Sequence, residues 1–248
     1  MPESVVLLHG FGGTHRAWDG VIAALDRERY RPLALDLPGH GEAADVERPI
    51  TFAGCVAHVL ARAPERFALC GYSMGGRVAL RVALAAPERV ARLVLVSTSA
   101  GIEDVAERAA RREADERLAR ELETVPFEQF IERWRTQPLF AEDPPEVGAL
   151  AREDQRRNRP DALAAVLRDI GTGEMESLWG RLAELTMPAI MLVGDRDEKF
   201  QALGRRMAEL LPDAQMAVVS GGHNLALENP DAVAQALQRI DPQAAGRR

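Results

Sequence analysis

Cysteine, lysine and long apolar runs are scarce in this chain. The 248 residues include two cysteines, Cys55 and Cys70, too few for a disulfide framework. No apolar run reaches the roughly 18 residues of a membrane-spanning helix, and no signal peptide is recognisable. Lys199 is the single lysine, and the arginines form no basic stripe, which argues against a nucleic-acid partner. We expect a cytoplasmic protein that binds neither nucleic acid nor membranes.

The apolar residues that are present occur in short runs separated by helical patterns. Each run ends in a polar or glycine-rich loop, as buried parallel strands do. The sequence therefore predicts an α/β fold with a mostly parallel, doubly wound sheet. The six expected strands are 5–8, 32–37, 67–70, 90–97, 188–193 and 214–219.

The pattern changes in the middle of the chain. Charged sequence rich in alanine, arginine and glutamate begins near residue 103, and a second helical stretch lies near 162–170. We predict that residues 99–185 are a helical lid inserted into one domain. Residues 1–98 and 186–248 would then form the two parts of its core.

A G-x-S-x-G motif at 71–75 lies between an apolar run and an apolar-periodic helix. Small residues two before and two after Ser73 permit the sharp strand-to-helix turn of a nucleophile elbow. The helix N-terminus adds positive potential at the serine. The motif alone also suits an ordinary strand-to-helix connection, but Ser73 is the first candidate for chemistry.

An acid and a histidine follow two later strands. Asp197 comes after the run 190–194 and His223 after the run 218–222, so the chain order is serine, acid, histidine. An imidazole can take the serine proton, and a carboxylate can orient that imidazole. Singly, Asp197 fits a turn and His223 a helix start; jointly they predict a catalytic triad. Asp195 is the rival acid, ranked second because Asp197 lies further out on the loop.

The stretch His9-Gly10-Phe11-Gly12-Gly13 follows the first expected strand. It suits an oxyanion loop in which the amides of Phe11 and Met74 face developing negative charge. The same residues would also serve as a glycine-permitted turn. The histidines, cysteines and carboxylates show no metal-ligand spacing, so neither a metal nor another cofactor is predicted.

Together these motifs resemble the α/β-hydrolase superfamily over essentially the whole chain. Within it, the sequence is similar to the 2-succinyl-6-hydroxy-2,4-cyclohexadiene-1-carboxylate synthase family of menaquinone (vitamin K2) biosynthesis. The similar segments are 71–77, Trp134 with 137–140, 167–173 ahead of 177–179, 194–200 and 222–224.

The resemblance implies a lyase. That family eliminates pyruvate from 2-succinyl-5-enolpyruvyl-6-hydroxy-3-cyclohexene-1-carboxylate, with the triad acting as a base. His223, oriented by Asp197, would draw the proton from Ser73, whose oxygen would remove the ring proton next to the ketone. Expulsion of the enolpyruvyl group by C–O cleavage would follow without water.

The resemblance also implies cationic side chains for a substrate with three carboxylates. Arg77 lies one helical turn beyond Ser73 and would flank it; otherwise it is a solvated helix arginine. Arg111 falls where the family has a substrate-binding arginine. Its helix also carries many acidic side chains at i,i+4 spacing, so an ion pair within the helix would explain Arg111 as well. Trp134 and Tyr72 match a lid tryptophan and an elbow tyrosine, which packing alone would also explain.

One position departs from the family. Counting along the chain, the second lid arginine of the family falls on Gln155. A one-residue slip before Pro160 would put Arg156 in that role. If Arg156 does not take that role, one carboxylate of the substrate has no bidentate arginine partner.

Two other functions use the same motifs. A serine carboxylesterase or thioesterase would form an acyl intermediate on Ser73 with the same triad and oxyanion loop. A noncatalytic binding protein on a hydrolase fold is the third hypothesis, and the complete triad argues against it.

Overall fold

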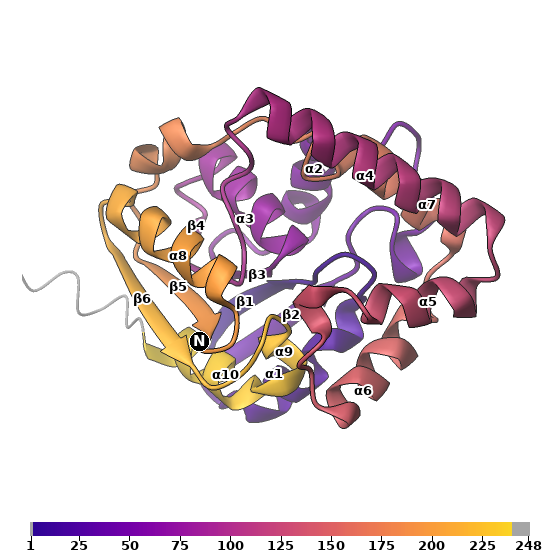
Figure 1. Cartoon of the computed structure of the whole chain (residues 1–248). Helices are drawn as coiled ribbons and strands as arrows, with labels where there is room; N and C mark the ends of the chain where they lie inside the picture. Colours follow the sequence, from indigo (N-terminus) through magenta and orange to yellow (C-terminus); the bar gives the residue numbers. More distant parts are fainter. Residues whose placement is uncertain (1, 240–248) are drawn as a thin grey trace, which may run out of the picture.

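A six-stranded sheet forms the centre of the molecule in the computed structural model, which describes residues 2–239 (Figure 1). All five neighbouring strand pairs are parallel, in the order β2-β1-β3-β4-β5-β6. The predicted α/β sheet of six strands is confirmed. The strands are β1 (Glu3–Leu8), β2 (Tyr30–Leu35), β3 (Phe67–Tyr72), β4 (Val90–Val96), β5 (Ala189–Gly194) and β6 (Ala214–Val219).

Burial of the strands explains why their sequences show continuous apolar runs. Every residue of β3 and of β5 is buried, because helices cover both faces of the sheet there. The edge strand β6 is only partly buried, and Val218 is about half exposed. Strand β2 ends at Leu35, two residues earlier than predicted, and the backbone N–H of Leu37 donates to His9 Nε2.

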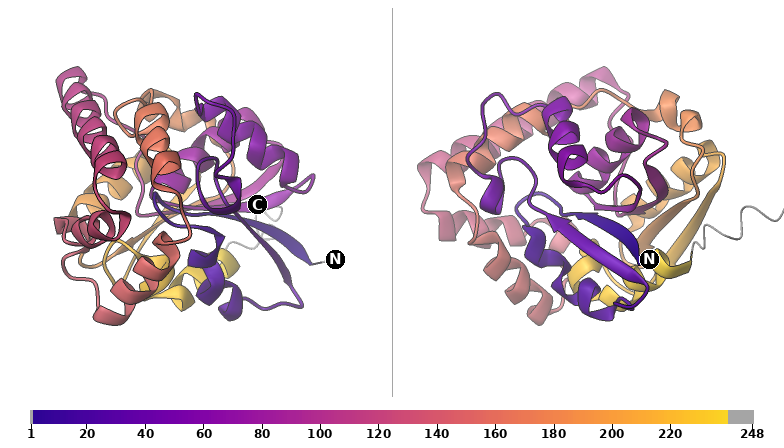
Figure 2. Two further views of the ribbon diagram at one scale, coloured as in Figure 1. Left: turned by 90° about the vertical axis from the view of Figure 1, so that its right-hand side faces the viewer. Right: turned by 180° about the vertical axis from the view of Figure 1, so that it is seen from behind.

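Two layers of helices sandwich the sheet (Figures 1 and 2). One apolar cluster packs one face of the sheet against α2, α3 and α8. A second cluster packs the opposite face against α1, α9 and α10. This doubly wound arrangement places all strand carboxyl ends at one edge, where ligands bind in such sheets. These helices are α1 (Asp19–Ala24), α2 (Phe52–Arg62), α3 (Met74–Ala85), α8 (Glu198–Leu210), α9 (Leu225–Glu228) and α10 (Pro230–Arg239).

The segment between β4 and β5 is helical and lies over the carboxyl edge of the sheet (Figure 1). Two helical stretches were expected there, and the structure has four α-helices. The two additional helices lie between the expected stretches: one begins directly after Pro126, and the other has Pro145 as its first residue, where a proline is tolerated. The four are α4 (Val105–Thr124), α5 (Phe127–Arg135), α6 (Pro145–Gln155) and α7 (Pro160–Ile170).

The last part of this segment returns to the core. Leu178 and Leu182 are fully buried and belong to the main apolar cluster with α3. The helical cover over the site is therefore made by α4 to α7. Residues 240–248 of the predicted second core part lie outside the described residues. Residues 2–239 also contain four short 3-10 helices: η1 (His15–Trp18), η2 (Gly41–Ala43), η3 (Pro138–Phe140) and η4 (Trp179–Glu184).

No helix within residues 2–239 has both the length and the apolar character needed to cross a lipid bilayer.

Candidate active site

Ser73 occupies a strained turn between β3 and α3. Its φ is 50° and its ψ is −110°, a conformation that residues other than glycine rarely adopt. The turn is close-packed: a Cβ on Gly75 would lie 2.1 Å from the carbonyl oxygen of Leu8. Glycine at 75 therefore lets the turn approach β1. The strain supports an elbow that lifts the serine oxygen out of the sheet.

A chain of hydrogen bonds connects Ser73, His223 and Asp197. His223 Nε2 is 3.2 Å from Ser73 Oγ, and His223 Nδ1 is 2.7 Å from Asp197 Oδ2. The three residues follow β3, β6 and β5, so the carboxyl edge of the sheet brings them together. His223 and Asp197 are both buried. An imidazole placed between an acid and a serine can accept the serine proton.

Asp195, the rival acid, is held in a different role. Its Oδ1 accepts a hydrogen bond of 2.9 Å from the backbone N–H of Gly221, and its side chain is half exposed. It therefore braces the loop that carries the histidine. Asp197 is the carboxylate in contact with the ring of His223.

Three aromatic rings surround the imidazole of His223. The ring centroids of Phe200, Tyr72 and Phe140 lie 4.5, 5.3 and 6.0 Å from that of His223. Burial raises the pKa of the Tyr72 hydroxyl, so Tyr72 stays neutral. The rings limit the movement of the imidazole and shield it from water.

Phe11 and Met74 both line the cavity above Ser73. Met74 begins α3, where a backbone N–H has no partner within the helix. Within the part of the chain that the structure describes, no protein acceptor binds either the Phe11 or the Met74 amide. Two free amides beside a serine are what an oxyanion hole requires.

The cavity has a volume of about 790 Å³ and reaches from the sheet edge to the helical cover. Arg77 on α3 lines the cavity and is buried. Its guanidinium donates to the carbonyl oxygen of Ile170 at 3.3 Å. Burial lowers the pKa of Arg77 to about 10, which leaves it cationic at neutral pH.

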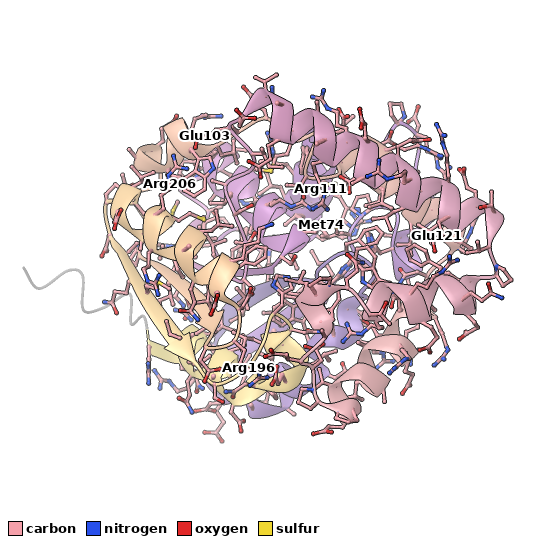
Figure 3. The ribbon with its side chains drawn as sticks, viewed as in Figure 1. Met74, Glu103, Arg111, Glu121, Arg196 and Arg206 are labelled. Atoms are coloured by element: carbon pink, nitrogen blue, oxygen red, sulfur yellow. The ribbon has the colours of Figure 1, made fainter. Side chains whose placement is uncertain are left out.

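Arg111 enters the same cavity from the helical cover. It extends from α4 toward Met74 (Figure 3), and its Nε is 2.9 Å from Asp115 Oδ1. Asp115 is buried, and burial raises the pKa of its carboxyl group. The Arg111 side chain is 40% exposed, in contrast to Arg77. Two guanidinium groups from different layers thus face one space.

Three more cations line the cavity, and two of them are paired. Arg206 is 2.6 Å from Glu103 (Figure 3), and Arg196 pairs with Glu228. Lys199 lies two residues after Asp197, and no carboxylate of residues 2–239 is within ion-pair distance of it. Lys199 therefore offers an uncommitted positive charge.

Trp134 on α5 connects the helical cover to the loop of Phe11. The two ring centroids are 5.0 Å apart, and Trp134 also lies 6.1 Å from Phe140. It lines the cavity with Tyr72. Both side chains therefore lie at the cavity that contains Ser73.

The structure does not bring Arg156 to the cavity. Arg156 lies on the outer surface of the cover, where its guanidinium pairs with Glu128 at 2.9 Å. Gln155 is buried instead, and its Nε2 lies 3.1 Å from where a Cβ on Gly12 would be. The one-residue slip proposed for Arg156 does not occur, because α6 continues through Gln155 and turns position 156 outward.

Comparisons with known proteins agree with this geometry. The sequence pattern of the alpha/beta hydrolase family matches residues 5–236. The chain belongs to the α/β-hydrolase family. It is 35% identical to the 2-succinyl-6-hydroxy-2,4-cyclohexadiene-1-carboxylate synthase of Citrobacter koseri over 245 residues, 95% of this chain and 92% of that protein. The synthase of the same name from Enterobacter sp. (strain 638) is 34% identical, with 95% and 90% coverage.

A solved structure, MenH from S. aureus, matches this α/β-hydrolase with a TM-score of 0.88 and 33% identity. The match covers 95% of this chain and 92% of that one. The resemblance inferred from motifs is confirmed at the level of family and fold, and this chain is an enzyme on the hydrolase scaffold.

Sequence reasoning missed three residues of this α/β-hydrolase site: Phe140, Phe200 and Lys199. Lys199 and Phe200 lie two and three residues after Asp197, in the first turn of α8, so their closeness in the sequence was a usable signal. Phe140 approaches His223 from the helical cover, and only folding brings the two together. The residues around Phe140 in the sequence do not predict its contact with His223.

Proposed function

We propose that this enzyme eliminates pyruvate from 2-succinyl-5-enolpyruvyl-6-hydroxy-3-cyclohexene-1-carboxylate. The product would be 2-succinyl-6-hydroxy-2,4-cyclohexadiene-1-carboxylate, a step of menaquinone biosynthesis. The observation that carries the proposal is the pair Arg77 and Arg111, which face the same cavity as a serine hydrogen-bonded to His223. A base beside two cations suits proton removal from a polycarboxylate. The names of the relatives from Citrobacter koseri and S. aureus support the same reaction.

The reaction would begin with proton transfer. His223 Nε2, held by Asp197, accepts the proton of Ser73, and the serine oxygen removes the ring proton next to the succinyl ketone. Negative charge then moves to the ketone oxygen, where the amides of Phe11 and Met74 would bind it. Collapse of this dienolate forms the second ring double bond and breaks the C–O bond to the enolpyruvyl group. Protonation of the departing enolate gives pyruvate, so no water is consumed.

The carboxylates would be bound by cations of both layers. Buried Arg77 would take one carboxylate, and Arg111 would take a second one as it shifts away from Asp115. Lys199 is suited to the third, since it lines the cavity without an ion-pair partner among residues 2–239. Trp134 and Tyr72 would enclose the ring of the substrate. Arg156 receives no role, because its guanidinium is on the outer surface.

Ester or thioester hydrolysis is the second candidate. Gln155 favours it, because the site lacks the second lid guanidinium that the synthase family has at this position. Water would then attack an acyl group on Ser73, and the same amides would bind the tetrahedral oxyanion. The two reactions differ at Ser73: elimination leaves its oxygen unmodified, whereas hydrolysis acylates it.

The test is pyruvate release from freshly made substrate, corrected for spontaneous decay. We expect the wild type to release pyruvate rapidly and Ser73→Ala to lose at least about 10³-fold in kcat, as removal of a triad nucleophile does. Both proteins should give the same circular dichroism spectrum. A folded wild type that does not accelerate release, but shows a burst with small aryl esters, would replace this proposal with the hydrolase.

A further inference from the structure

Hydrogen bonds fix the backbone of residues 10–13, and the side chains that make them do not line the cavity. The carbonyl oxygen of Gly10 accepts hydrogen bonds from His9 Nδ1 at 2.8 Å and from the N–H of Gly13 at 3.1 Å. This carbonyl belongs to the same peptide as the Phe11 N–H. Because a trans peptide points its C=O and N–H in opposite directions, anchoring Gly10 directs the Phe11 N–H away from the anchor.

Gly12 is held from both sides by side chains that are distant in sequence. Its N–H donates to His40 Nε2 at 3.2 Å, and its carbonyl oxygen accepts from Asn158 Nδ2 at 2.8 Å. Gly12 has a φ of +75°, so the loop depends on a conformation that glycine adopts freely. Phe11 therefore lies between two peptides that are each fixed by hydrogen bonds.

The two side chains are joined to each other. Asn158 Oδ1 accepts a 3.0 Å hydrogen bond from the N–H of Gly41, the residue that follows His40. Gly12, His40, Gly41 and Asn158 thus form a closed ring of contacts, which we call the Gly12 clamp. Asn158 belongs to the connection between α6 and α7, so the clamp ties the helical cover directly to the loop that carries the Phe11 amide.

The chemistry of His40 suits an acceptor. Its side chain is fully buried, and burial lowers the pKa of the imidazole well below its usual value of 6.5. The ring is therefore neutral, and its Nε2 lone pair is free to accept from Gly12. The rings of His9 and Phe11 pack edge-on against it at 4.8 and 5.8 Å.

We propose that His40 and Asn158 are positioning residues for the oxyanion hole: by clamping Gly12 they hold the Phe11 amide toward the oxygen that becomes negative. This inference rests on the proposed function, since it assigns the clamp to that reaction. It makes correct docking of the α6–α7 connection a condition for an assembled site. Neither residue touches the substrate, and both act through the backbone of residues 10–13.

The variants separate hydrogen bonding from packing. His40→Leu removes the acceptor for the Gly12 N–H, and His40→Gln returns an acceptor oxygen on a side chain of similar length. Asn158→Leu removes the donor to the Gly12 carbonyl. Arg159→Gln is the matched control, because Arg159 pairs with Asp45 and Asp161 next to the same connection but does not contact Gly12.

Two measurements are made on each folded variant: kcat and KM for pyruvate release, and exchange of the Gly12 amide hydrogen followed by NMR. In His40→Leu we expect kcat to fall about 10- to 100-fold while KM stays within about twofold of the wild-type value. This fall in kcat should not exceed the fall caused by removing an oxyanion-hole donor altogether. Gly12 exchange should accelerate at least about tenfold, because its hydrogen bond is gone. Asn158→Leu should also lower kcat. The kcat of His40→Gln should be within about threefold of the wild-type value, because the acceptor is restored. The kcat of Arg159→Gln should equal that of the wild type.

The exchange measurement needs no substrate, so it judges the clamp even if the wild type releases no pyruvate. Unchanged Gly12 exchange in His40→Leu would overturn the clamp itself. Faster exchange with unchanged kcat would overturn its link to catalysis. An equal loss of kcat in Arg159→Gln would show that docking of the cover in general, and not the grip on Gly12, sets the rate.

Discussion

The part of the site built on the sheet and the part built on the helical cover are held in different ways. Ser73, Asp197 and His223 each follow a strand, and five sets of parallel strand pairings fix where those strands end. Arg111 and Trp134 belong to helices that reach the core through side-chain contacts. Strand topology therefore places the proposed catalytic residues, whereas the residues proposed to bind substrate from the cover depend on the packing of separate helices.

The two arginines show the difference most clearly. Arg77 on α3 is buried and held by the carbonyl oxygen of Ile170, while Arg111 on α4 is 40% exposed and held by Asp115. A rigid, buried cation loses little freedom when it binds a carboxylate, and an exposed one is screened by water. We therefore expect sheet-side substitutions to affect activity more than substitutions in the cover.

The largest effect is expected from Asp197→Asn. The carboxylate holds the tautomer of His223 that accepts the Ser73 proton, and its loss should lower kcat by about 10⁴-fold. Asp195→Asn is the control, because an amide oxygen can still accept from the N–H of Gly221. Pyruvate release measures both. A greater loss in Asp195→Asn would show that the acid had been assigned to the wrong residue.

A smaller effect is expected from the arginines, and it should differ between the layers. Arg77→Met should reduce kcat/KM by about 10- to 150-fold, the value of one charged hydrogen bond of roughly 1.5 to 3 kcal/mol. Arg111→Met should cost about three- to tenfold, because its exposed charge is screened. Steady-state kinetics at constant ionic strength would check this. If Arg111→Met were the more damaging change, the cover and not the sheet would dominate recognition.

A stability effect is expected from His40→Gln. Burial keeps the pKa of His40 well below 6.5 in the folded protein, so below pH 6.5 the unfolded chain binds a proton that the folded chain does not. The free energy of unfolding should therefore fall with decreasing pH, with His40 contributing up to about 1.4 kcal/mol per pH unit. Glutamine does not titrate, so urea unfolding at pH 7 and pH 5 should show a smaller loss for the variant. Equal losses would mean that His40 is protonated in the fold.

The smallest effect is expected from Arg156→Gln. The Arg156 side chain is 46% exposed, pairs with Glu128, and does not line the cavity. Such exposed pairs contribute little, so kcat/KM should change by less than about twofold. A loss comparable to that of Arg111→Met would require α6 to rotate when substrate binds and would restore the interpretation first drawn from the sequence.

Much of the sheet-side site could be predicted because local sequence encodes it. The glycines around Ser73 fit a strained turn, and the loops with Asp197 and His223 follow apolar runs that predict strands. The helices of the cover were harder to predict from the sequence. The two middle helices, α5 and α6, were not predicted, although Pro126 directly precedes the first and Pro145 is the first residue of the second, as is common at helix starts.

The amino-acid sequence by itself determined the α/β class, the sheet and the order of serine, acid and histidine, since buried runs and sharp turns depend on neighbouring residues. Only the tertiary structure decided which carboxylate meets His223, that Arg156 faces outward while Gln155 is buried, and that His40 and Asn158 hold Gly12. These choices depend on contacts between residues far apart in the chain, up to 146 positions for Asn158 and Gly12. A local pattern does not specify such contacts, because they follow from how helices and loops pack once the sheet is formed.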